Sequence, residues 1–117
     1  MQTNYLSHLP LTETTFYILL SLAPGKKHGY AILKDVQALS NGEVSLSTST
    51  LYSALSRLLD QGLIERISDD PENSAGPGLP RKAYVLSDVG RRVLKAATNR
   101  MQALVAAARL RLGEERT

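Results

Sequence analysis

A long helical pattern at the C-terminal end limits the possible folds of this 117-residue chain more than any other feature. Ser87 is a suitable N-cap, and the helix predicted after it runs to about Leu112, about 36 Å at 1.5 Å per residue. Apolar residues recur along it mainly in steps of three and four, the spacing of a seam between two helices. This seam consists of Leu94, Ala97, Met101, Leu104, Val105 and Ala108. A domain of this size cannot cover so long a seam by itself, so we predict a homodimer.

Two short helices are predicted in the N-terminal part of the chain. Thr12 is a suitable N-cap for the first, and Pro24 ends it because proline cannot continue the hydrogen-bond ladder. The second helix begins at about Gly29 and stops at residues 40–42, where a glycine supplies the positive φ that helix ends commonly need. A brief extended segment fits residues 43–46.

The third helix, over residues 47–61, has two contrasting faces. Its apolar residues are spaced to face a core; they are Leu51, Ala54, Leu55, Leu58 and Leu59. The remaining surface carries small hydroxyl groups, one aromatic ring and one cation, where exposed helices more often carry Glu and Lys. Its residues are Thr48, Ser49, Thr50, Tyr52, Ser53, Ser56 and Arg57. This hydrogen-bonding surface is typical of a helix that reads base edges, although the serine-threonine run also fits a simple capping region.

Two strands complete the predicted domain. Residues 63–67 and 81–86 are rich in branched and aromatic side chains, and residues 69–80 between them form a loop with three prolines and two glycines. The order helix, helix, helix, strand, loop, strand is that of a winged helix-turn-helix. The predicted fold is therefore mainly α with a small β-hairpin: a winged helix-turn-helix domain over residues 1–86 and a dimerisation helix over residues 87–117.

The charge of the chain lies mostly in its last segment. The formal net charge is +3, yet residues 1–46 are balanced, residues 47–86 carry net −1, and residues 87–117 hold seven cations against three acids. Composition alone therefore points to nucleic acid only weakly. No apolar run approaches the roughly 20 residues of a membrane span, no secretory leader pattern opens the chain, and there is no cysteine, so we expect a cytoplasmic protein.

Sequence motifs for catalysis are missing. There is no cysteine nucleophile, no glycine-rich phosphate loop after a strand, and the two histidines lack metal-ligand spacing. We therefore expect neither enzymatic activity nor a metal or other cofactor. The alternative to a DNA-binding protein is a winged-helix protein-interaction module, because this fold serves both purposes.

Several short segments, in this order and spacing, resemble the PadR family of transcriptional regulators from about residue 11 to 94. They are His28-Gly29-Tyr30, Ser47-Thr48-Ser49-Thr50-Leu51-Tyr52, Ala54-Leu55, Leu58, Gly62-Leu63-Ile64, Pro80-Arg81-Lys82, Tyr84, Leu86-Ser87 and Gly90-Arg91-Arg92. The resemblance implies a repressor whose affinity for operator DNA falls when a small molecule or a stress signal acts. A single long C-terminal helix resembles the smaller subgroup, whose members dimerise through it. Ser53 and Ala83 depart from the residues usual in the family.

These patterns assign roles to individual residues. The hydroxyls of the third helix would meet base edges and phosphates, and Arg57, Arg81 and Lys82 would bind phosphate. A two-fold dimer requires an inverted-repeat operator with half-sites about 34 Å apart. The acidic residues between the strands would repel phosphates; they are Asp69, Asp70 and Glu72.

The remaining expectations concern aromatic, histidine and apolar side chains. Tyr30 and Tyr84 are predicted in the core or in an interface. A packing or hydrogen-bonding role is expected for His28, whereas His8 is expected in a mobile tail. A cavity between the dimer seams and the winged cores, lined by residues such as Phe16, Met101 and Leu104, would suit an apolar effector.

Overall fold

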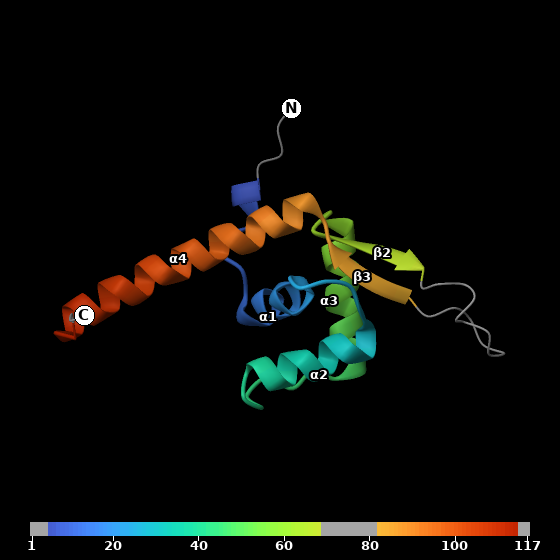
Figure 1. Ribbon diagram of the computed structural model, residues 1–117, viewed down its shortest axis with the longest axis horizontal. Helices are drawn as coiled ribbons and strands as arrows, with labels where there is room; N and C mark the ends of the chain where they lie inside the picture. Colours follow the sequence, from blue (N-terminus) through green and yellow to red (C-terminus); the bar gives the residue numbers. More distant parts are fainter. Residues whose placement is uncertain (1–4, 69–81, 115–117) are drawn as a thin grey trace.

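A computed structural model describes residues 5–68 and 82–114 of the chain. Three helices and a small sheet form the winged core, from which one long helix projects (Figure 1). The elements in chain order are η1 (Tyr5–His8), α1 (Glu13–Leu22), β1 (Lys27–His28), α2 (Gly29–Leu39), α3 (Thr48–Asp60), β2 (Ile64–Ser68), β3 (Lys82–Leu86) and α4 (Asp88–Leu112). The predicted loop over residues 69–80 lies outside the described residues, as does Arg81.

Three helices begin at the hydroxyl residues predicted to cap them. The side-chain oxygen of Thr12 accepts a hydrogen bond from the Thr15 N–H, that of Ser47 from Thr50, and that of Ser87 from Gly90. Each cap satisfies one backbone donor that the first helical turn leaves unpaired. The predicted starts of α1, α3 and α4 are therefore confirmed.

The sheet has three antiparallel strands in the order β1-β3-β2, one more than the predicted hairpin. The third strand is Lys27–His28, which pairs with Tyr84 and Ala83 of β3. Residues 43–46, for which a brief extended segment was expected, form no strand. A two-residue strand has too few positions for alternation to reveal it, because its pairing is set by the tertiary position of the turn between α1 and α2.

The core lies between α1, α2, α3, the sheet and the first turns of α4. Its largest fully buried apolar side chains come from α1, α2, α3, α4 and β2 and from the turn before β2: Ile18, Leu19, Leu22, Ile32, Val36, Leu51, Leu55, Leu58, Leu63, Ile64 and Val93. Because α3 supplies three of them, its orientation is fixed by packing, and its opposite face is left to solvent.

Helix α4 packs on the core along its first ten residues only. Its buried residues end at Ala97, and residues 98–114 are all exposed. Figure 1 shows this second half extending away from the sheet, toward the C-terminal end of the chain. None of the helices within the two described segments is long and apolar enough to cross a membrane.

The expectation of a mobile tail at His8 was wrong. His8 ends the short helix η1, which contacts α4, and the following Leu9 and Leu11 pack against the core. These two leucines hold the segment in place because their burial removes apolar surface from water.

Candidate nucleic-acid interface

One face of α3 is open to solvent along its whole length. All seven α3 residues predicted to contact DNA are exposed: Thr48, Ser49, Thr50, Tyr52, Ser53, Ser56 and Arg57. Among the described residues, the side chains of Thr48, Ser53 and Ser56 make no hydrogen bond. Their hydroxyls are therefore available to a ligand, as donors and as acceptors.

The start of α3 combines capping with exposure. Ser47 Oγ donates to Thr50 Oγ1 at 2.9 Å and accepts from the Thr50 N–H at 3.1 Å, while Ser49 Oγ lies 3.4 Å away. The capping interpretation is thus correct for Ser47, and Thr50 is partly engaged within the helix. The hydroxyls farther along α3 are not part of this network.

Tyr52 connects α3 to the start of α2. A Cβ atom built on Gly29 would lie 2.7 Å from Tyr52 Cζ and closer still to the hydroxyl oxygen, so the end of the Tyr52 ring lies directly against Gly29 and would have to shift for any larger residue. Gly29 is buried, whereas Tyr52 remains 45% exposed. The tyrosine therefore packs with one edge and presents the other to solvent.

Tyr30 and Tyr84, the two tyrosines expected in the core or in an interface, differ from each other. Tyr84 is only 5% exposed, which confirms a core position, whereas Tyr30 is 71% exposed and belongs to no core within the chain. Lys34 Nζ lies 5.9 Å from the centre of the Tyr30 ring, a weak cation-π arrangement at the surface of α2. The sequence position of a tyrosine does not reveal whether its ring is buried or exposed, because the body of the side chain is apolar and its tip is polar.

Burial raises the pKa of the Tyr84 hydroxyl, and the nearby Tyr52 raises it further, whereas Arg66 opposes both effects. Arg66 and Tyr84 are register partners on the adjacent strands β2 and β3. Sequence reasoning gave Arg66 no role. The register that places Arg66 beside Tyr84 comes from the pairing of β2 with β3, which cannot be predicted from the sequence of either strand alone.

The predicted phosphate ligands occupy different parts of the fold. Lys82 is exposed at the start of β3, opposite Ser68. Arg57 lies in the last turns of α3, where it borders a polar pocket of about 320 Å³ together with His8 and Gln61. It is therefore separated from the hydroxyl-rich start of the helix by about two turns.

The predicted dimer seam divides into two parts. Leu94 and Ala97 are 7% and 5% exposed because they pack on the chain's own core. Met101, Leu104 and Val105 are 48%, 66% and 49% exposed, and Ala108 is exposed as well. The outer part thus has no partner within the chain, and its role in dimerisation stays a prediction.

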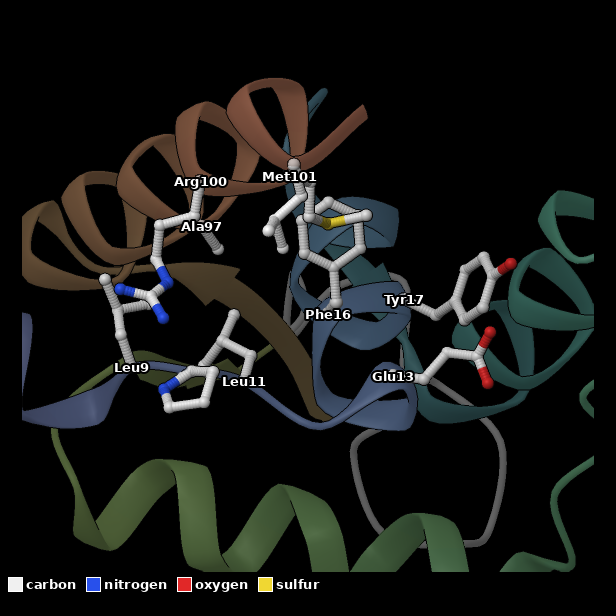
Figure 2. A pocket seen from close by; sticks show the side chains of 10 residues that line it. Leu9, Leu11, Glu13, Phe16, Tyr17, Ala97, Arg100 and Met101 are labelled. Carbon is white, nitrogen blue, oxygen red and sulfur yellow. The ribbon is translucent and has the colours of Figure 1, made fainter. Parts of the chain in front are cut away.

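An apolar pocket of about 370 Å³ lies between α1, α4 and the segment at residues 9–11. Phe16, Met101 and Leu104, the three residues expected to line an effector cavity, all line it. Figure 2 shows Arg100 pointing from α4 toward Leu9 and Leu11, with Glu13 and Tyr17 on the other side. No group of three or more His, Cys, Asp or Glu residues in the described segments could hold a metal ion.

Comparisons with known proteins agree with the PadR resemblance. No curated protein matches the chain in sequence. Among solved structures, PadR of Bacillus subtilis in complex with operator DNA is 28% identical over 74% of this chain and 47% of that protein, with a TM-score of 0.63. The chain thus spans about half the length of that relative.

Two further structures match over most of their length. A PadR family regulator from Eggerthella lenta is 29% identical, with 85% of this chain and 82% of that protein covered and a TM-score of 0.61. A PadR family regulator from Clostridium difficile has the same fold, with 24% identity, 86% and 99% coverage and a TM-score of 0.71. The model of the PadR-like family of transcriptional regulators matches residues 18–96, and the chain belongs to this family.

Proposed function

We propose that this protein is a transcriptional regulator that binds double-stranded DNA in a sequence-specific manner through α3. The observation that carries the proposal is the open face of α3, whose side chains are mostly small, uncharged and hydrogen-bonding, with one tyrosine and one arginine among them. A helix of this width fits the major groove, and short hydroxyl side chains allow its backbone to approach the bases. The operator complex of the B. subtilis relative supports this reading.

Sequence selectivity and affinity come from different residues. Thr48, Ser49 and Ser53 meet base edges, and the Thr48 methyl group suits contact with thymine. Arg57, Arg81 and Lys82 supply sequence-independent affinity by binding phosphates. Because each cation occurs twice in a dimer, binding weakens steeply as salt increases.

The active form in this proposal is a homodimer that joins through α4. The exposed second half of α4 carries Met101, Leu104 and Val105 in one stripe, which water disfavours. Pairing with a second copy covers this stripe and relates the two α3 helices by a two-fold axis. The operator is then an inverted repeat with half-sites about 34 Å apart.

Repression that is relieved by a small molecule completes the proposal. The pocket between α1 and α4 is apolar over most of its lining and lies where the winged core meets the dimerisation helix. An apolar ligand there changes the angle between the two elements, and so the distance between the α3 helices. Binding of ligand and DNA are then coupled reciprocally.

The test is a salt titration of binding to duplex DNA. Sequences selected from random duplexes by the purified protein should contain an inverted repeat, and fluorescence anisotropy with the selected duplex should give an affinity that falls steeply with salt. A scrambled duplex of the same length is the control. No enrichment combined with no salt-dependent binding would refute the proposal and favour a protein-interaction module.

A further inference from the structure

A second pocket lies where the end of α3 meets the start of α1 and the short helix η1. Its volume is about 320 Å³, its lining is mostly polar, and it shares only Pro10 and Leu11 with the apolar pocket beside α4. Hydrogen-bond donors reach its lining from three elements: Arg57 and Gln61 from α3 and its C-cap, His8 from η1 and Thr15 from α1. Its size is at the lower end of the range of pockets that hold small molecules.

Most of these donors have no partner within the protein. Among the described residues, the side chains of Arg57, His8 and Gln61 form no hydrogen bond or ion pair. Thr15 is only 8% exposed, and its hydroxyl accepts a hydrogen bond from that of Thr12 at 2.9 Å. None of the hydrogen bonds found in residues 5–68 and 82–114 uses the Thr15 hydroxyl proton. The pocket therefore collects unused donors, and a ligand rich in acceptors would satisfy them.

The charge of the lining is positive. Arg57 carries a permanent charge, and no aspartate or glutamate of the described segments lines the pocket. The acids nearest in sequence are Glu13 and Asp60, of which Glu13 lines the apolar pocket and Asp60 lines neither. A cation that no acid balances within the same cavity attracts an anion.

The arrangement of the donors selects the shape of this anion. A carboxylate has two oxygens in one plane and is satisfied by a single guanidinium. A phosphoryl group presents three acceptor oxygens in different directions, so it can bond donors from α3, η1 and α1 at once. Arginine also binds phosphate through two parallel hydrogen bonds. A phosphoryl group fills only part of about 320 Å³, which leaves room for a small organic group beside it.

We propose that this pocket binds the phosphoryl group of a small molecule, with Arg57 as its main ligand and His8, Gln61 and Thr15 completing the site. The binding itself goes beyond the proposed function and does not depend on it. One consequence rests on that function: Arg57 is also a proposed ligand of DNA phosphates, so an occupied pocket engages the same guanidinium. Binding of the phosphorylated compound and of DNA then oppose each other.

The experiment is calorimetric titration of the full chain without DNA, at constant ionic strength set with sodium chloride. Inorganic phosphate and glycerol 3-phosphate are the two probes, and both should bind. Tighter binding of glycerol 3-phosphate identifies a phosphorylated metabolite as the ligand, and tighter binding of inorganic phosphate identifies the free ion. Acetate is the planar control and should bind at least roughly tenfold more weakly, because it leaves donors unpaired.

Variants locate the site. Arg57→Gln should weaken phosphate binding at least roughly tenfold, the effect of losing charge-assisted hydrogen bonds. Arg109→Gln, the same change at the far end of α4 (Figure 1), is the matched control and should bind as the wild type does. Thr15→Val keeps the shape of the side chain but removes its donor, so it should also weaken binding. In NMR spectra, phosphate should shift the side-chain amide signals of Gln61, and thermal unfolding checks that each variant is folded.

The outcomes separate this inference from the proposed function. If neither probe binds the wild-type protein, or if Arg57→Gln and Arg109→Gln bind phosphate equally well, the inference is refuted whatever the protein does with DNA. If phosphate binds through Arg57 but DNA binding shows no salt dependence, the inference stands and the proposed function fails. If both bind, phosphate at constant ionic strength should lower the DNA affinity of the wild type and not that of Arg57→Gln; an unchanged wild-type affinity refutes the shared use of Arg57.

Discussion

The contact between the start of α4 and the turn after α3 gives a sharp prediction about Gly90. A Cβ atom on this residue would lie 2.9 Å from the Leu63 carbonyl carbon and 3.3 Å from its Cα, and closer still to its oxygen. The neighbouring hydrogen bonds hold the two segments together: Ser87 N–H donates to the Leu63 carbonyl at 3.1 Å, and Ser87 Oγ to the Gly62 carbonyl at 2.6 Å. Backbone atoms held in this way cannot move aside as a flexible side chain would.

Two effects of opposite sign determine the stability of Gly90→Ala. Replacing glycine by alanine within a helix stabilises it by up to about 1 kcal/mol. Overpacking against fixed neighbours costs about 1–3 kcal/mol, and the collision with backbone places this site at or above the upper end. We therefore expect a net loss of about 2 kcal/mol, or a decrease in Tm of roughly 8 °C.

Thermal and urea unfolding followed by circular dichroism test this expectation. Protomer concentration must be equal for all variants, because the proposed dimerisation would make Tm depend on it. Gly25→Ala is the control, since a Cβ there meets no atom within 4 Å and the residue has no positive φ; its Tm should stay equal or rise slightly. A Gly90→Ala protein as stable as the wild type would show that α4 does not pack against the Leu63 backbone as described.

Three other changes test separate parts of the fold. Leu104→Glu places a carboxylate on the 66% exposed side chain of the proposed dimer seam, so light scattering at micromolar concentration should show a monomer; a persistent dimer would exclude this surface. Ser53→Asp puts a negative charge on the open face of α3 and should weaken DNA binding at least roughly tenfold without changing Tm, whereas unchanged affinity would exclude groove contact. The pKa of Tyr84 is raised in the folded chain above its ordinary value of 10.0, so the unfolded chain releases the proton first. The contribution of Tyr84 to the free energy of unfolding is therefore complete below pH 10 and is lost as the pH rises further. Urea titrations at several pH values above 10 should therefore show that the free energy of unfolding falls less in Tyr84→Phe than in the wild type. An equal decrease in the two proteins would contradict this.

The helix boundaries were predictable because the chemistry that sets them is local. Thr12, Ser47 and Ser87 each cap a helix through a backbone N–H three residues ahead, so a short stretch of sequence contains all the relevant groups. The strand at residues 27–28 depends on contacts with β3, more than fifty residues later. No local pattern carries that information.

The open face of α3 was predictable for a related reason, since the apolar residues of an amphipathic helix indicate which side is buried. The core position of Tyr84 was predicted as well, whereas the exposure of Tyr30 and the place of Arg66 opposite Tyr84 were not. A tyrosine has an apolar body and a polar tip, so its pattern in sequence fits either environment. Arg66 acquires its position only through the register between β2 and β3.

The stripe along α4 shows what helical periodicity leaves open. Leu94 and Ala97 have the same spacing as Met101 and Leu104, yet the first pair is buried in the chain's own core and the second is exposed. A period of three and four residues marks a face to be covered and says nothing about which surface covers it. Since Ala97 and Met101 both line the pocket beside α1, this pocket begins where internal packing ends. A ligand bound there would touch the core and the outer half of α4 together, which is why we place the proposed coupling between effector and DNA at this point.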